Sequence, residues 1–479
     1  TVDAQGRVTA ASTGTGGASA INDLSDGVSN SSGATIGLGT GALANDDGTT
    51  NNNTAVGKNA LNANTSGSEN TALGAFALDA NTTASENTGV GYLSLSGNST
   101  GAYNTAVGTN SLYNNTTANN NTGLGRDALY SNTTGASNTA VGADALQYNT
   151  TGLNNVAIGH DTLDANTTGY QNVAVGKDAL TSNTTGNNNT AVGYNALGAN
   201  TTGTENVAVG YATLDADDVH TRCTAVGYNA LTSNTGNENT AIGRKALFAN
   251  TSGVSNVGVG VGALEQNTTG SGNVAIGQNC LLQGTALGSN TAIGYDAMRN
   301  HTQNNNVAIG HSAMKTSTTG GTNVAIGEAS MRDGTGYIQC VAVGYGSLED
   351  NNAHRNTAVG YNALMSNTSA NNGTAVGHEV LINSTTGSDN VGLGYHALKT
   401  NTTGVGNVCI GNSAGQAVTT GQNNVCLGRG AGLLLTGGSE NLMLGRKAGE
   451  TSGPTNGSRN VLIGLDTRCA TNGQNNLVV

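Results

Sequence analysis

Residues 189–197 read Asn-Thr-Ala-Val-Gly-Tyr-Asn-Ala-Leu, and residues 198–205 continue Gly-Ala-Asn-Thr-Thr-Gly-Thr-Glu. Together they form one copy of a unit of about seventeen residues that recurs along nearly the whole chain. The register follows the glycine that ends each Asn-Thr-Ala-Val-Gly, here Gly193, from Gly39 to Gly464. We call this residue the repeat glycine and number other positions from it, so that Leu197 is at position +4. Self-similarity at a fixed period indicates a stacked repeat architecture.

Within each unit, the residues around the repeat glycine predict β-structure. The residue before the glycine is Val, Ile or Leu, as at Val192, and the one before that is usually Ala or Gly, as at Ala191. This pattern predicts a strand of four to five residues with one small and one branched face. Leu197 predicts a second short strand or a bend, and residues 200–203 have turn chemistry. A helix would need apolar residues at three-to-four spacing over ten or more positions, which the repeat glycine interrupts.

We therefore predict an all-β chain that forms a parallel β-solenoid of about 26 coils, one per 17-residue repeat. Residues 35–407 form the regular array, and residues 408–479 form modified C-terminal coils and a cap. Residues 1–12 are expected to form a short hairpin, and residues 13–34 a connector rich in Gly, Ser and Asn. At about 4.8 Å per coil, the array would measure on the order of 120 to 130 Å.

The composition excludes several functional classes. The chain of 479 residues has 74 glycines, one proline, no tryptophan and two phenylalanines, which is unlike the makeup of a thick globular core. Its net charge of -12, with 10% charged residues, argues against nucleic-acid binding through a basic face. No apolar run approaches the roughly 18 residues of a membrane span, so we expect no membrane insertion.

The two faces of the predicted strand indicate association between chains. The few small or medium apolar side chains of each unit bury too little surface to offset the ordering of a whole repeat. We expect the remainder to come from backbone ladders and from Asn and Thr side chains that bond along the stack. Because Ala55 lies on one strand face and Val56 on the other, one face can fill the coil while the other meets a second chain. We predict a parallel homotrimer.

Particular copies of the repeat carry a family resemblance. Residues 155–159 (Asn-Val-Ala-Ile-Gly) and the identical residues 323–327 resemble repeats in the heads of trimeric autotransporter adhesins. That resemblance implies a left-handed β-roll in trimers, although adhesin heads have shorter coils. The array is also similar to those of phage tail fibres, and residues 1–10 are similar to a segment recurrent in phage tail-fibre and tail-spike proteins.

The resemblance to phage tail fibres implies a structural role. The chain is expected to be a non-catalytic fibre shaft in the virion that extends or presents host-receptor binding. The implied partners are two further copies of the chain, a host cell-surface glycan or protein receptor, and other virion tail proteins. The alternative is a bacterial trimeric surface adhesin or extracellular filament at the cell surface. Neither interpretation implies an enzyme, a cofactor or a metal.

Candidate reactive residues are better explained by the repeat. Acidic residues occur mainly one at a time in turns, whereas glycoside cleavage needs paired carboxylates. The six cysteines are expected to be buried thiols, with Cys409 and Cys426 stacked on neighbouring coils. Position +1 holds tyrosine on consecutive coils, which favours a stacked ladder over sugar binding. It also holds three histidines several coils apart, too far to chelate one ion within a chain, namely His160, His311 and His378.

Breaks in the consensus are the places where we expect surface contacts, because turns carry variation on a rigid scaffold. The predicted receptor-contact residues lie in these breaks and are Asp218, His220, Arg222, Tyr337, His354 and Arg355. Near the C-terminus, position +4 changes from leucine to Gly415, Gly432 and Gly449, so that the cross-section of the coil must change there.

Overall fold

The computed structural model describes residues 27–29, 35–49, 51–216, 219–317, 320–449, 456–468 and 472–479. Within these ranges it contains strands and turns and no helix. The chain divides into two compact units, residues 1–205 and 206–479, and each is described by itself. The hairpin predicted at residues 1–12 lies outside the described residues. Of the segment predicted as a connector, residues 27–29 are described and form a strand.

Both units consist of short strands separated by turns. The strands of the first unit are β1 (Gly27–Ser29), β2 (Ile36–Leu38), β3 (Thr54–Val56), β4 (Thr71–Leu73), β5 (Thr88–Val90), β6 (Thr105–Val107), β7 (Thr122–Leu124), β8 (Thr139–Val141), β9 (Val156–Ile158), β10 (Val173–Val175) and β11 (Thr190–Val192). The strands of the second unit are β12 (Val207–Val209), β13 (Thr224–Val226), β14 (Thr240–Ile242), β15 (Val257–Val259), β16 (Val274–Ile276), β17 (Thr291–Ile293), β18 (Val307–Ile309), β19 (Val324–Ile326), β20 (Val341–Val343), β21 (Thr357–Val359), β22 (Thr374–Val376), β23 (Val391–Leu393), β24 (Val408–Ile410), β25 (Val425–Leu427), β26 (Leu442–Leu444), β27 (Val461–Ile463) and β28 (Leu477–Val478).

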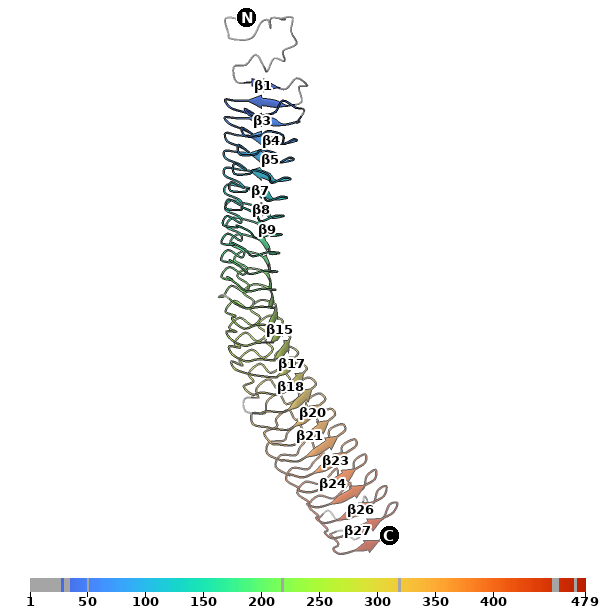
Figure 1. The fold of residues 1–479 in the computed structure, drawn as a ribbon. Helices are drawn as coiled ribbons and strands as arrows, with labels where there is room; N and C mark the ends of the chain where they lie inside the picture. Colours follow the sequence, from blue (N-terminus) through green and yellow to red (C-terminus); the bar gives the residue numbers. More distant parts are fainter. Residues whose placement is uncertain are drawn as a thin grey trace, which may run out of the picture. The chain divides into compact units, whose positions relative to one another are not determined.

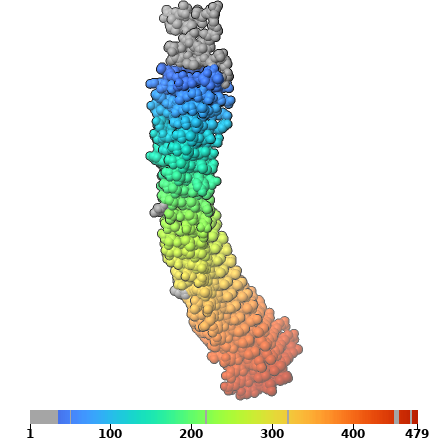
Figure 2. Space-filling view, in the orientation of Figure 1, coloured from blue at the N-terminus to red at the C-terminus, as the bar shows by residue number. Residues whose placement is uncertain are grey.

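Each unit is a parallel β-solenoid, as predicted. Within a unit every strand from β2 onward pairs in parallel with the next, and equivalent residues face each other, as Ala174 faces Ala191. Only β1 differs among the described strands, since it pairs antiparallel with β2. The two units contain about 25 turns with a repeat of about 17 residues. Figure 1 shows the strands of each unit in sequence order along one side, and Figure 2 shows the matching order of colours.

The repeat glycine ends each strand from β2 to β27 after three residues, which is shorter than the four to five predicted. At Gly108 the backbone φ is 136°, a conformation that side chains disfavour. A Cβ added at Gly108 would also lie 2.4 Å from the carbonyl oxygen of Gly125, the repeat glycine of the next coil. Glycine is therefore required for two reasons. The backbone bend needs a positive φ, and the repeat glycine of the next coil lies too close for a side chain.

The interior of each coil is narrow and filled by small side chains. The middle residue of the strand, such as Ala106, points inward and is completely buried, whereas Thr105 and Val107 on either side face outward. Position +4 supplies the largest inward side chain, as at Leu112, which is completely buried. Its φ of 54° is left-handed, so that this position is a bend rather than a second strand.

Two rows of buried asparagines run along the inside of the stack. One row precedes the strand, as at Asn70, and the other occupies position +7, as at Asn81. Within one coil, the Nδ2 atoms of both residues donate to the carbonyl of Ala84, at 2.9 and 3.0 Å. Between coils, Asn81 Nδ2 donates to Asn64 Oδ1 at 3.1 Å, and the Oδ1 of Asn53 accepts from the Asn70 N–H at 2.9 Å. The asparagines thus pair a turn carbonyl and link successive coils.

Exchange of volume between neighbouring positions keeps the coil closed near the C-terminus. Where position +4 becomes Gly415, the middle of the strand changes from alanine to Cys409, whose Sγ would lie 2.5 Å from a Cβ added at that glycine. Gly449 faces Met443 in the same way, with 2.8 Å to Sδ. The predicted change of cross-section is therefore an exchange in which the inward side of the strand gains the volume that position +4 loses.

The position +7 row is interrupted in the second unit at Ser384. Its Oγ is buried without a hydrogen-bond partner, and so are Oδ1 and Nδ2 of Asn401 on the next coil. On the preceding coil, Asn367 continues the row, since its Nδ2 donates to Asn351 Oδ1 at 2.8 Å. An unpaired buried polar group costs about 1 to 3 kcal/mol.

We predict that Ser384→Asn stabilises the second unit by about 1 to 2 kcal/mol, because the new amide can donate to Asn367 and accept from Asn401. Thermal unfolding followed by circular dichroism measures the effect. The matched control is Asn132→Ser, which breaks an intact part of the row in the first unit and should destabilise it. A lower unfolding temperature for Ser384→Asn would contradict this account of the row.

Candidate functional site

Position +1 forms an exposed row of aromatic and charged side chains beside the strand edge. In the second unit, four of these side chains occupy consecutive coils, namely Tyr345, Tyr361, His378 and Tyr395. Their rings stack with centroid separations of 5.3, 5.0 and 5.2 Å. Tyr211 and Tyr228 stack in the same way at 5.2 Å. These contacts confirm the predicted ladder for these coils.

The stacking determines what the aromatic row can bind. The two faces of Tyr361 and of His378 each lie against a neighbouring ring, with interplanar angles of 11° to 22°. A sugar ring that stacks on an aromatic side chain needs a free face. The inner rings of the row therefore offer only their edges to solvent, which disfavours sugar stacking on them.

A cluster of ionisable groups lies beside this row. Glu379 follows His378, and His396 occupies position +2 of the next coil. The Nε2 atom of His396 is 2.9 Å from Glu379 Oε2, and the Lys399 ammonium nitrogen is 2.7 Å from the same oxygen. One ring nitrogen of each histidine and one carboxylate oxygen of Glu379 all lie within 4.8 Å of one another, so that they could bind the same metal ion.

The electrostatics of the cluster favour an ionised Glu379 carboxylate beside a neutral His396 ring. The hydrogen bond from Lys399 is the main cause of the lowered pKa of the Glu379 carboxyl. Desolvation, followed by the nearby Lys399 charge, lowers the pKa of His396. At neutral pH the cluster thus presents a carboxylate and a neutral imidazole that is half-buried.

Sequence reasoning missed this cluster because it compared only histidines at position +1. Those three histidines are several repeats apart in the sequence, and His160 and His311 are about half exposed. The second histidine of the cluster, His396, is at position +2. The signal available in the sequence was the spacing, because His396 lies seventeen residues after Glu379, at the same position one repeat later.

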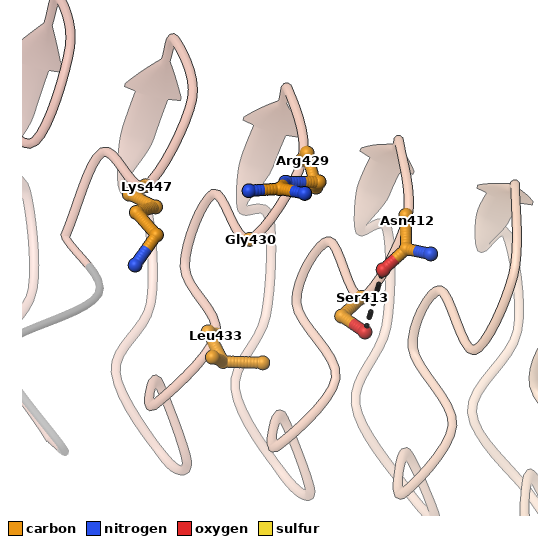
Figure 3. A pocket seen from close by; sticks show the side chains of 6 residues that line it. All are labelled: Asn412, Ser413, Arg429, Gly430, Leu433 and Lys447. Carbon is orange, nitrogen blue, oxygen red and sulfur yellow. Dashed lines mark hydrogen bonds between the residues drawn. The ribbon is translucent and has the colours of Figure 1, made fainter.

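Farther along the second unit, a shallow pocket lies mainly at positions +1 and +2 of successive coils. Its lining consists of Asn412, Ser413, Arg429, Gly430, Leu433 and Lys447. Figure 3 shows the Arg429 guanidinium and the Lys447 ammonium on neighbouring coils, and the bond in which Ser413 Oγ donates to Asn412 Oδ1 at 3.1 Å. At position +1, the aromatic side chains thus give way to Asn412, Arg429 and Arg446 toward the C-terminus.

The predicted receptor-contact residues that the structure describes do not form one surface. Asp218 lies outside the described residues. His220 and Tyr337 are completely buried, which corrects the expectation that they contact a receptor. The Arg222 side chain is 61% exposed, and its guanidinium pairs with a Glu238 carboxylate oxygen at 3.0 Å.

The last two predicted contacts lie on a different coil of the second unit. His354 is half-buried, and its Nδ1 accepts a hydrogen bond from the Ile338 N–H at 3.2 Å. Its neighbour Arg355 is exposed. These two residues remain accessible, but they do not form a cluster with Arg222.

Tyr337 is buried because it fills the place of a missing asparagine. Position +7 of its coil is Gly334, and a Cβ added there would lie 2.7 Å from the Tyr337 ring. The hydroxyl group donates to the Met331 carbonyl at 3.0 Å. Gly284 and Leu287 repeat this exchange, since Leu287 Cδ1 would lie 2.1 Å from a Cβ on Gly284. These breaks in the consensus are alternative fillings of the interior.

The five described cysteines are free and buried, as predicted for them, whereas Cys469 lies outside the described residues. Cys409 faces Cys426 across β24 and β25, as expected for neighbouring coils. Burial raises the pKa of the Cys280 thiol to about 12, and it also raises the pKa of Cys409. Neutral thiols of this kind are poor nucleophiles.

His301 occupies position +7, where most coils have asparagine, and it is completely buried. Its Nδ1 is 3.0 Å from the Ser317 carbonyl oxygen, and its Nε2 is 2.8 Å from Asn306 Nδ2. The carbonyl requires a donor at Nδ1 and the amide requires an acceptor at Nε2, so that the neutral ring satisfies both. Burial lowers the pKa of His301 to about 4.

Comparisons with known proteins assign no family to this arrangement. No protein-family model matches the chain, and no curated protein matches it either. Among the described residues, none belongs to a helix of the length and apolarity that a membrane crossing requires.

We predict that the second unit loses stability as the pH falls from about 6.5 to about 4, because the unfolded state then binds a proton that folded His301 excludes. The contribution of neutral His301 to the free energy of unfolding is complete above its unfolded-state pKa of about 6.5 and amounts to about 3 kcal/mol. Unfolding followed at several pH values measures it, and His301→Asn should flatten this part of the profile. An unchanged profile in His301→Asn would show that other groups cause the acid sensitivity.

Proposed function

We propose that this chain is the structural shaft of an extracellular fibre, of the kind found in phage tail fibres, and that it acts without catalysis as a parallel homotrimer. The observation that carries the proposal is the pairing of each coil with the next by identical contacts, which makes each unit a linear spacer. Such a spacer holds a receptor-binding element away from the particle that carries it.

The outward face of the strands supports association with other copies of the chain. The sixteen three-residue strands of the second unit provide 32 outward positions, which hold Thr or branched apolar side chains. Ile242 and Ile276, for example, are 41% and 39% exposed. A stable interface uses about 20 to 30 residues from each partner. A strand face of this size that consists mostly of branched apolar side chains favours burial against other copies.

Host contact in this proposal falls to the accessible side chains of the breaks, which include Arg222 and Arg355. The receptor would be a glycan or protein of the host surface, and further tail proteins would hold the fibre ends. A bacterial trimeric adhesin or extracellular filament is the second candidate, because the same coils would serve equally as a spacer at a cell surface. Immunogold labelling separates the two, since the phage proposal requires label on virions and fails if label appears only on cells.

We predict that the purified chain has about three times its monomer mass of 47.3 kDa in light scattering. The double variant Ile242→Glu and Ile276→Glu should dissociate, because charge on the outward face cannot be buried without a partner. The control Gln266→Glu adds an exposed charge in a turn and should leave the mass unchanged. A monomeric wild-type chain would refute the trimer.

A further inference from the structure

We propose that His378, Glu379 and His396 form a binding site for a divalent transition-metal ion such as Zn²⁺, built within one chain across two consecutive coils. Two imidazoles and one carboxylate are a ligand set that suits Zn²⁺, with a fourth position left for water. The proposal is independent of the fibre function, because all three ligands belong to one chain.

The coil geometry brings the three ligands together. His378 and Glu379 follow β22, and His396 follows β23, so that the ladder between these strands fixes the two coils in register. Glu379 and His396 both adopt positive φ, 52° and 59°, which is the regular conformation of position +2. The scaffold therefore holds a carboxylate and an imidazole one above the other, at 2.9 Å between Oε2 and Nε2.

The surroundings of the site hold two ligands firmly and leave the third adjustable. His396 and Glu379 are half-buried, and the Tyr395 ring centroid is 3.7 Å from that of His396. His378 is exposed, and its ring lies between those of Tyr361 and Tyr395, so that its free edge, which carries the ring nitrogens, is the part that can reach the ion. The ligand atoms, now within 4.8 Å, need only a modest approach to reach metal–ligand distances of about 2.0 to 2.2 Å.

Lys399 is the main opponent of metal binding. Its ammonium nitrogen lies 2.7 Å from Glu379 Oε2 and 3.5 Å from His396 Nε2, where it supplies the positive charge that an ion would supply. The Lys399 side chain is 30% exposed, so that it can move into solvent when an ion enters. Replacement of Lys399 by an uncharged residue should therefore strengthen metal binding. If the cluster served only as an ion pair, the same replacement would instead weaken it.

The first unit contains a related group at the same positions of the coil. His160 and Asp161 occupy positions +1 and +2, and Asp144 occupies position +2 of the neighbouring coil. His160 Nδ1 lies 2.6 Å from Asp161 Oδ2, and the Asp144 carboxylate forms an ion pair with the Arg126 guanidinium. With one imidazole in place of two, this group should bind Zn²⁺ more weakly and serves as an internal comparison.

Isothermal titration of the full chain with Zn²⁺ tests the proposal. We expect His396→Ala and Glu379→Gln each to weaken the tighter site at least about 10-fold, and Lys399→Met to strengthen it roughly 3- to 10-fold. His396→Ala should fold, because Ala329 occupies position +2 with a φ of 56°. Cobalt substitution gives a second measurement, since visible absorption reports the ligands of Co²⁺ directly.

The matched control is His311→Ala. His311 is a position +1 histidine that stacks on Tyr295, and its Nδ1 lies 3.9 Å from a Glu328 carboxylate oxygen. Among the described residues, His311 and Glu328 belong to no group of three potential metal ligands. Removal of His311 should leave the tighter site intact. Unchanged Zn²⁺ affinity and stoichiometry in both His396→Ala and Glu379→Gln would overturn the proposal, as would weaker binding in Lys399→Met.

Discussion

Closure of most coils depends on a buried asparagine amide that reaches the carbonyl of a turn. In the coil that contains Gly74, Asn70 and Asn81 both donate to the carbonyl of Ala84, while their side-chain oxygens face the next coil. A coil with so narrow an interior cannot hide a turn carbonyl among apolar side chains, because an unpaired buried acceptor is costly. The amide satisfies that acceptor and, by the same residue, joins successive coils.

The interior tolerates other solutions when volume and hydrogen bonding change together. Tyr337 with Gly334, and Leu287 with Gly284, fill the space of a missing amide with a ring or a branched chain. Met443 with Gly449 shifts volume across the coil in the same manner. Ser384 and Asn401 show the result when only one half of an exchange is made, because polar atoms then remain buried and unpartnered. Close packing explains why such changes occur in pairs.

Periodicity made the architecture predictable, since a strand that recurs every seventeen residues leaves few ways to stack. The two strand faces, one small and one branched, the stacked thiols of Cys409 and Cys426, and the tyrosine ladder also followed from the repeat. Which of the two faces points inward became visible only in the structure. The predicted bonding of asparagine side chains along the stack is also confirmed. Their burial was not predicted, because Asn-Thr-Thr-Gly is ordinary turn chemistry and only the three-dimensional path shows that the amide points inward. Tyr337 was misassigned to the surface for the same reason, although the glycine three residues earlier was a usable signal.

In-register pairing of like residues has a consequence for how such a chain changes over generations. Ala174 meets Ala191 just as Ala157 meets Ala174, so that removing or duplicating one whole repeat recreates the same contacts at the junction. A deletion of part of a repeat would instead bring a repeat glycine over a side chain, which the spacing at Gly108 does not accommodate. Recombination between near-identical segments of the gene can therefore alter length in discrete steps of one coil, and selection can adjust reach without redesigning the protein.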